Sequence, residues 1–242
     1  MLKEAWRLGL MSAEDYQRAA DFANVKATRE PAGEYLPEEV IGALLAVCDA
    51  DLTLAGARDG AIIAVLDACG LCRAELVAAQ YAHYQRATRM LRIIGKGNKQ
   101  RTIPVNTFAA RYLEAWLASR GNAPGPLFPR LERGGNKIRL YAGRPRQMTP
   151  AAVKDVLDKR AGQAGTGAVR PHDARRTFVS NMLRVTDAIQ TARMAGHASV
   201  DTTMRYDLRP DEELRGSADR LRAPQVRPLR PAPTSPPQSP PA

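Results

Sequence analysis

The sequence predicts a mainly α-helical fold with one small antiparallel β-sheet, which places it in the α+β class. Apolar residues recur at the spacing of one helix face in several segments, among them 38–48 and 56–69. One segment, 89–105, instead contains two strand-like runs around a glycine-containing turn. The 242 residues are enough for one medium-sized domain with extensions, and a hydrophobic content of 44% supplies an ordinary core.

The N-terminal third of the chain is predicted to be helical. Residues 1–30 have the pattern of one amphipathic helix with a frayed end, whose apolar face needs a partner. Residues 31–33, Pro-Ala-Gly, are typical of a linker. The next helix begins at 36–39, where a proline lies in the first turn and two glutamates lie near the positive end of the helix dipole. A further helix runs from about Gly56 to Cys69, and Gly70 interrupts it.

The middle of the chain predicts a hairpin followed by helices. Residues 90–94 and 101–105 flank the turn 95–99, Gly-Lys-Gly-Asn-Lys, whose glycines permit the positive φ of a tight turn. Thr149-Pro150 predicts a capped helix start, and three more helical segments follow. Two apolar stripes are expected in the core: Phe108, Tyr112, Leu113, Trp116 and Leu117, then Val153, Val156 and Leu157.

The chain is strongly basic, with a formal charge of +11 and a sequence pI near 10.0. Such a charge attracts polyanions, so nucleic acid is favoured as a partner over the interpretation of a merely soluble basic protein. The motifs and the resemblance described below imply double-stranded DNA. Residues 130–146 carry only one acid, Glu132, and are either a solvated loop or a loop that follows DNA phosphates. The candidate DNA-binding residues there are Arg130, Arg133, Lys137, Arg139, Arg144 and Arg146.

Several classes of protein are disfavoured by the sequence. No apolar run reaches the roughly 18 residues of a membrane span, so no membrane partner is expected. The first residues lack the apolar core of a signal peptide. Three cysteines do not form a disulfide framework, which favours a reducing cytoplasm. The tail 223–242 is rich in proline and serine and is predicted to be disordered.

Two short motifs carry the chemistry. Residues 171–178 read Pro-His-Asp-Ala-Arg-Arg-Thr-Phe, and residues 195–199 read Ala-Gly-His-Ala-Ser, followed by Tyr206. Transfer of a phosphoryl group between DNA strands needs a nucleophile and positive donors on the non-bridging oxygens. Tyrosine can form the covalent intermediate, and arginine offers a permanently charged fork to phosphate. No metal and no organic cofactor is implied.

From about Leu36 to about Leu221 the chain resembles the catalytic domain of the tyrosine recombinase, or phage integrase, family. The resemblance implies a DNA breaking-rejoining fold and site-specific cutting and rejoining through a 3′-phosphotyrosyl bond. It also implies roles for single residues. These are Tyr206 as nucleophile, His172, Arg175 and His197 as donors to the phosphate, and Lys96 in the lysine turn as proton donor to the leaving 5′-oxygen. His172, Arg175, His197, Lys96 and Cys72 are expected to meet in one basic cleft, with Tyr206 apart on a helix that is mobile before DNA assembly.

The chain departs from the family pattern at Cys72. The family's first box reads Gly-Leu-Arg-x-x-Glu-Leu, whereas residues 70–76 read Gly-Leu-Cys-Arg-Ala-Glu-Leu. Loss of such a donor costs about 3–4 kcal/mol, so activity is expected to be impaired. Arg73 is adjacent, but on a helix its side chain would point about 100° away. A non-catalytic DNA-binding remnant of a recombinase is therefore the alternative function.

The resemblance also implies a domain organisation. Residues 1–32 correspond to the last helix of a core-binding domain plus a linker, and residues 33–222 to the catalytic domain. The tail 223–242 follows it. Partner recombinase subunits in a DNA-assembled tetramer are expected from the same resemblance.

Cys69 and Cys72 form a Cys-x-x-Cys motif, which leaves a redox or metal protein as a second alternative. The βαβ pattern of a thioredoxin-like protein is not found. A zinc site would need two more ligands, and His83, the one nearby candidate, is expected at the surface. Coincidence is the favoured interpretation of the motif.

Overall fold

The computed structural model describes residues 2–21, 33–207 and 215–216. One compact unit comprises Met1–Tyr206, and nearly all of the second, Asp207–Ala242, lies outside the described residues together with the tail predicted to be disordered. No helix in the described ranges combines the length and apolar character that a membrane span requires. The helices are α1 Leu2–Arg7, α2 Ala13–Ala20, α3 Glu38–Asp49, α4 Leu54–Cys69, α5 Arg73–Ala78, α6 Thr107–Arg120, α7 Pro150–Ala164, α8 Pro171–Val185, α9 Ala188–Ala195 and α10 Val200–Met204.

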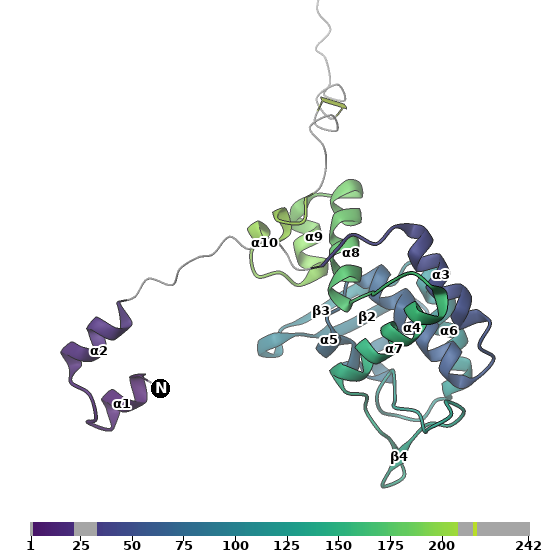
Figure 1. The fold of residues 1–242 in the computed structure, drawn as a ribbon, viewed down its shortest axis with the longest axis horizontal. Coiled ribbons are helices and arrows are strands. Elements are labelled where there is room, and N and C mark those ends of the chain that lie inside the picture. The colour runs from purple at the N-terminus through teal and green to yellow at the C-terminus, as the bar shows by residue number, and fades with distance from the viewer. Residues whose placement is uncertain (1, 22–32, 208–214, 217–242) are drawn as a thin grey trace, which may run out of the picture. The chain divides into compact units, whose positions relative to one another are not determined.

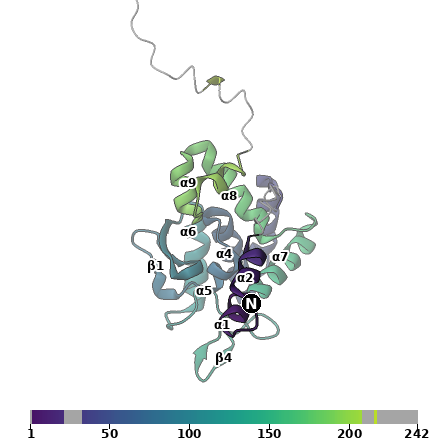
Figure 2. The ribbon, with the colours of Figure 1, turned by 90° about the vertical axis from the view of Figure 1, so that its left-hand side faces the viewer.

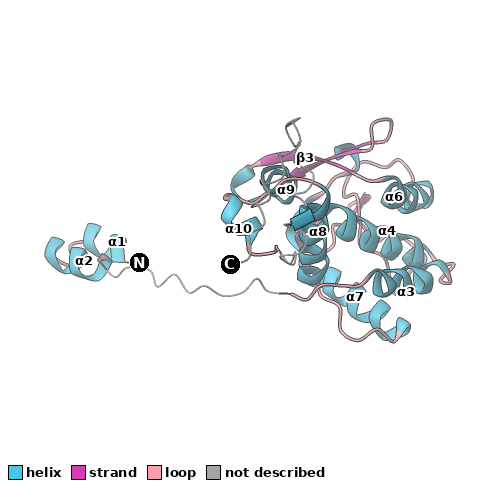
Figure 3. Ribbon diagram, turned by 90° about the horizontal axis from the view of Figure 1, so that it is seen from above, coloured by secondary structure: helices cyan, strands magenta, loops and turns pink. Residues whose placement is uncertain are grey.

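The strands belong to two small antiparallel sheets. The first has the order β1-β2-β3, and Leu91 lies opposite Ile103 with both side chains buried. Figure 3 shows the β2–β3 hairpin along one edge of a body that is otherwise helical, which confirms the predicted α+β class. The second sheet lies within 130–146, predicted as a loop. The strands are β1 Tyr84–Gln85, β2 Met90–Ile94, β3 Gln100–Pro104, β4 Leu140–Tyr141 and β5 Arg144–Pro145.

The N-terminal segment forms two short helices, so the prediction of one helix over residues 1–30 is wrong. Gly9, between them, has φ +70°, a value that glycine adopts without strain. Ser12 then caps α2, because its Oγ accepts a backbone N–H at 3.0 Å. The rings of Trp6 and Tyr16 stack with centroids 5.3 Å apart and join the two helices.

Helix α4 is the central helix of the fold (Figure 1), and α3, α6 and α8 pack on it. Its residues are apolar nearly all round, which is the pattern of a buried helix. It ends at Gly70, which has φ +57° in the left-handed region, as the predicted interruption requires. Helix α6 buries Trp116 as expected. Phe108, in its first turn, is 46% exposed, so its assignment to the core is wrong.

A buried ion pair joins α7 to α4. Arg160 is fully buried, and its Nη2 donates to Asp59 Oδ2 and to Asp51 Oδ2, each at 2.7 Å. A hydrogen bond from the Thr53 hydroxyl, together with the one from Arg160, lowers the pKa of Asp51 to about 2. These charges hold the helix that leads from the basic segment 130–146 toward the motif residues of α8.

Candidate active site

Helix α8 begins at Pro171, the first residue of the first motif. The segment before α3 is hydrogen-bonded to the first two turns of α8. Asp173 is buried, and its carboxylate accepts the backbone N–H groups of Arg170 at 2.7 Å and Glu34 at 2.9 Å. Thr177 Oγ1 accepts the N–H of Leu36 at 2.8 Å. Because these bonds join the segment before α3 to one face of α8, they fix the direction of the opposite face.

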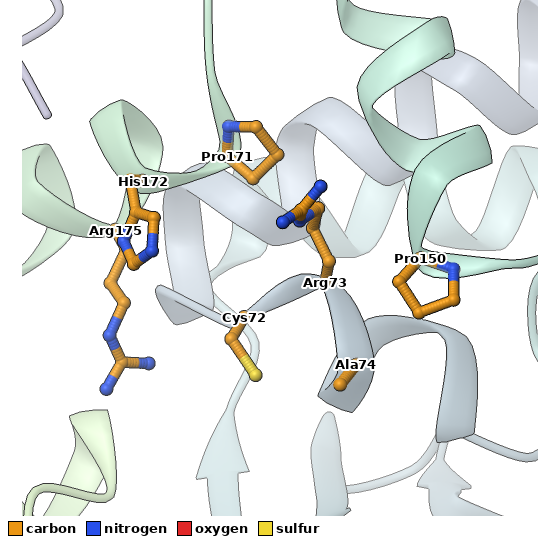
Figure 4. A pocket seen from close by; sticks show the side chains of 7 residues that line it. All are labelled: Cys72, Arg73, Ala74, Pro150, Pro171, His172 and Arg175. Atoms are coloured by element: carbon orange, nitrogen blue, oxygen red, sulfur yellow. The ribbon is translucent and has the colours of Figure 1, made fainter.

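That face presents His172 and Arg175, one helical turn apart, to a cavity of about 220 Å³ (Figure 4). Arg175 connects three separate segments, because Nη1 donates to the Gly70 carbonyl at 2.7 Å and Nη2 to the Ala195 carbonyl at 2.6 Å. Its guanidinium also lies 3.8 Å from a carboxylate oxygen of Glu75. The arginine is thereby held in one orientation, with its remaining N–H groups beside the cavity.

Cys72 lies between this cavity and a second one of about 640 Å³, and both Cys72 and Arg175 line the two. The second cavity is also lined by Lys99, Arg101 and His197. Burial raises the pKa of the Cys72 thiol, and the nearby Glu75 carboxylate raises it further, which keeps the thiol neutral. A neutral thiol offers no charged donor to a phosphate at this position.

Arg73 lines the smaller cavity together with Cys72, His172 and Arg175. Cys72 is the N-cap of α5 and has extended backbone angles, φ −77° and ψ 160°, so the two neighbours are not both inside a helix and the 100° offset does not apply as such. Their side chains still point in different directions, as Figure 4 shows.

Arg101, on β3, is a residue of this site that the sequence analysis missed. Both Nη atoms bond the Glu75 carboxylate, and Nε donates to the Met194 carbonyl at 2.9 Å. Burial alone would raise the pKa of Glu75, but the bonds from Arg101 and from the Cys72 N–H outweigh it and lower that pKa. One signal was available in the sequence. Strand alternation places Arg101 on the same face as buried Ile103, and an arginine there needs a partner.

Gly196 is required where Arg101 meets the end of α9. It has φ +72°, and a Cβ there would lie 2.6 Å from Arg101 Nη1. His197 follows Gly196 directly after the end of α9, and its Nδ1 lies 2.8 Å from the Thr203 hydroxyl oxygen. Burial first, and then the charges of Arg175 and Arg101, lower the pKa of His197 to about 4.

Tyr206 does not stand apart, contrary to the expectation for it. Its ring stacks on His197 with centroids 5.7 Å apart and an interplanar angle of 16°. The Ser180 hydroxyl of α8 donates to the Tyr206 carbonyl at 3.0 Å. The tyrosine therefore lies next to a histidine of the larger cavity, packed beside the apolar cluster that contains Phe178.

The remaining sequence candidates are Lys96 and the basic residues of 130–146, and the latter do not line either cavity of the site. Lys96 has its backbone in the turn between β2 and β3, and its side chain lies outside the described part of the chain. The basic residues of 130–146 are all exposed, and Figures 1 and 2 show β4 on a projecting hairpin. Gln147 Nε2 donates to the Val77 carbonyl at 2.7 Å, and Pro150 lines the smaller cavity, so this segment leads to the site.

Within the part of the chain that the structure describes, the cysteine motif has no set of further metal ligands around it. Cys69 is fully buried, and burial raises the pKa of its thiol to about 12. His83 was expected at the surface but is buried. Its Nδ1 accepts the backbone N–H of Gln80 at 3.2 Å within a short turn. Among the described residues, no three His, Cys, Asp or Glu side chains are grouped as a metal site would need.

The sequence of this domain matches a known family. Residues 34–212 match the model of the phage integrase family, known also as the tyrosine recombinases. The chain belongs to the phage integrase family. Its motifs at 171–178 and 195–199 lie inside the matched range.

Named relatives of this integrase-family chain agree with the match. It is 33% identical over 173 residues to tyrosine recombinase XerC of Myxococcus xanthus, covering 71% of this chain and 56% of the relative. It is 30% identical over 200 residues to tyrosine recombinase XerC of Corynebacterium efficiens, covering 82% and 60%. The chain thus spans about half the length of the curated relatives that it matches.

The fold is also found in solved recombinases. The XerA recombinase structure has a TM-score of 0.61 at 21% identity, covering 91% of this chain and 77% of that one. The structure of XerH site-specific recombinase bound to its palindromic difH substrate after cleavage has a TM-score of 0.61 at 21% identity. That match covers 81% of this chain and 55% of XerH. At this identity the structures show a shared fold, in agreement with the expected recombinase-type domain.

We predict that His197 stays neutral in the folded chain down to about pH 5. The imidazole has an ordinary pKa of 6.5 and a folded pKa of about 4, so the unfolded chain binds the proton more readily between these values. Folding stability from this group is therefore present above pH 6.5 and is lost as the pH falls toward 4. NMR titration of the three histidines measures this, with His197→Asn to assign the signal. A midpoint near 6.5 for His197 would contradict the prediction.

Proposed function

We propose that this chain cuts and rejoins DNA at specific sites through a covalent bond between Tyr206 and a DNA 3′-phosphate. The observation that carries the proposal is that the four candidate residues are connected through two shared cavities and one ring stack. His172 and Arg175 share a cavity, Arg175 also lines the cavity of His197, and Tyr206 stacks on His197. A nucleophile therefore lies beside a group of phosphate donors that come from separate parts of the sequence.

The proposed reaction exchanges one phosphate ester for another. The Tyr206 oxygen forms a bond to phosphorus while the bond to the 5′-oxygen breaks, and water carries away the phenolic proton. Lys96 gives the 5′-oxygen its proton. Arg175, His172 and His197 donate to the non-bridging oxygens, where charge collects in the transition state. Because His197 Nδ1 is engaged by Thr203, Nε2 is the ring nitrogen that faces the phosphate in this proposal.

Neutral Cys72 removes one charged donor from this set, so we propose that the activity is impaired. The same observation favours a second candidate function, a DNA-binding remnant without catalysis. A duplex suicide substrate with a nick near the cleavage site separates the two. An active chain loses the short fragment beyond the nick and stays joined to DNA on a denaturing gel, whereas a remnant leaves no such band.

We also propose that the basic hairpin segment holds DNA beside the site. Its exposed arginines and Lys137 match the phosphate backbone in charge, and Pro150, four residues after the segment, lines the smaller cavity. Binding through phosphates releases counterions, so the affinity for duplex DNA depends on salt, with a slope set by the number of contacts.

We predict that the double change Arg139→Ala with Arg144→Ala lowers the salt slope of duplex DNA binding by about two. Fluorescence anisotropy between low and moderate salt measures the slope. Arg111→Ala, an exposed arginine on α6, serves as the control and is expected to leave the slope unchanged. An affinity that does not change with ionic strength would contradict a DNA-binding role for the hairpin.

The wider organisation is proposed on the family resemblance. Residues 1–32 represent the end of a core-binding domain with its linker, residues 33–222 the catalytic domain, and residues 223–242 a tail. Partner subunits assemble with this chain on DNA as a tetramer, and the chain acts in the cytoplasm, where its free cysteines stay reduced. The proposal that DNA is the partner is supported by the similar fold of XerH, whose structure was solved bound to its difH substrate.

A further inference from the structure

The smaller cavity has an unbalanced charge. Its lining contains two guanidinium groups, Arg73 and Arg175, the imidazole of His172 and the thiol of Cys72, but no carboxylate. Arg175 is partly neutralised from outside this cavity by Glu75, at 3.8 Å, and is engaged by two carbonyl groups. The Arg73 guanidinium has no hydrogen bond or ion pair within the described residues. Its charge is thus available to an anion that enters the cavity.

Arg73 reaches this space from the first position of α5, directly after the N-cap Cys72. Pro150 and Pro171 also line the cavity, and both are rigid residues at helix starts. In Figure 4 the Arg73 guanidinium points toward Pro171, whereas the Cys72 thiol and the Arg175 guanidinium point the other way. Two arginines from different helices, Arg73 of α5 and Arg175 of α8, thus line one cavity from different sides.

We propose that Arg73 binds a DNA phosphate oxygen in this cavity and supplies part of the contact that is missing at Cys72. The inference rests on the proposed recombinase function. Arginine suits the role because its fork stays charged and donates two hydrogen bonds to one phosphate. The replacement is partial, because Arg73 extends from the next position of the chain and meets the phosphate from the side of Pro171.

A double-mutant cycle at positions 72 and 73 tests the proposal. Cleavage of the nicked suicide duplex is measured for the parent chain, Arg73→Ala, Cys72→Arg and the double variant. We expect Arg73→Ala to slow cleavage at least tenfold in the parent chain and less than threefold when Cys72→Arg is present. Arg111→Ala is the control for the loss of one exposed positive charge. An equal loss in both backgrounds, or no loss in the parent, would overturn the proposal.

Failure of the proposed function gives a different result. If no variant, including Cys72→Arg, forms covalent DNA, the recombinase activity is refuted. The phosphate contact of Arg73 is then tested by the affinity of each variant for the same duplex. Arg73→Ala must then weaken binding more than Arg111→Ala does, and Cys72→Arg must restore the affinity. If Arg73→Ala binds the duplex as well as Arg111→Ala does, Arg73 has no role at the phosphate.

Discussion

The Cys72→Arg variant is expected to cleave a nicked suicide duplex about a hundredfold faster than the parent chain. Removal of one oxyanion donor typically slows an enzyme by about 10²- to 10³-fold, and adding the donor reverses that loss. The expected gain lies at the lower end because Arg73 already supplies part of the contact. Space is available, since position 72 is half-buried and lines both cavities.

A matched control separates charge from size at this position. Cys72→Met has a long side chain without charge and is expected to give no gain in cleavage. The free energy of unfolding in urea should change little for either variant, because the side chain faces a groove that DNA must enter. A Cys72→Arg rate equal to the parent rate would show that position 72 does not contact the phosphate.

The second large effect concerns the nucleophile. Tyr206→Phe is expected to lower covalent complex formation at least about a thousandfold, to the limit of detection, because phenylalanine has no oxygen to attack phosphorus. The fold should be unaffected, since the ring stacked on His197 is retained and the bond from Ser180 goes to the backbone. Tyr81→Phe, which loses a hydroxyl bond to Asn122 outside the site, is the control and should cleave normally.

Duplex binding by Tyr206→Phe distinguishes loss of chemistry from loss of structure. We expect the variant to bind the suicide substrate as tightly as the parent chain does. Covalent DNA that persists in this variant would mean that another residue is the nucleophile.

Much of the fold could be predicted because its signals are local. The hairpin around Gly97, the start of α7 at Thr149 and the end of α4 at Gly70 each depend on a few neighbouring residues. The N-terminal helix was predicted too long because the apolar pattern continues past Gly9 and the Ser12 cap.

The site could be predicted only in part. His172 and Arg175 lie together because residues three positions apart are neighbours on a helix surface, and this spacing can be read from the sequence. The bridge from Arg101 to Glu75 and Met194 joins segments far apart in the chain, and no local pattern reports it. Cys72 is the N-cap of α5, one residue before the helix in which it was expected, so helical spacing does not give the direction of Arg73 relative to it.

Mapping the covalent attachment site tests the central claim most directly. The Cys72→Arg chain is incubated with the nicked duplex, digested with nuclease and trypsin, and examined by mass spectrometry for peptides that carry a nucleotide. The account predicts a nucleotide on the tryptic peptide that begins at Tyr206, after Arg205. A nucleotide on any other peptide, or on none while the duplex is bound, would contradict it.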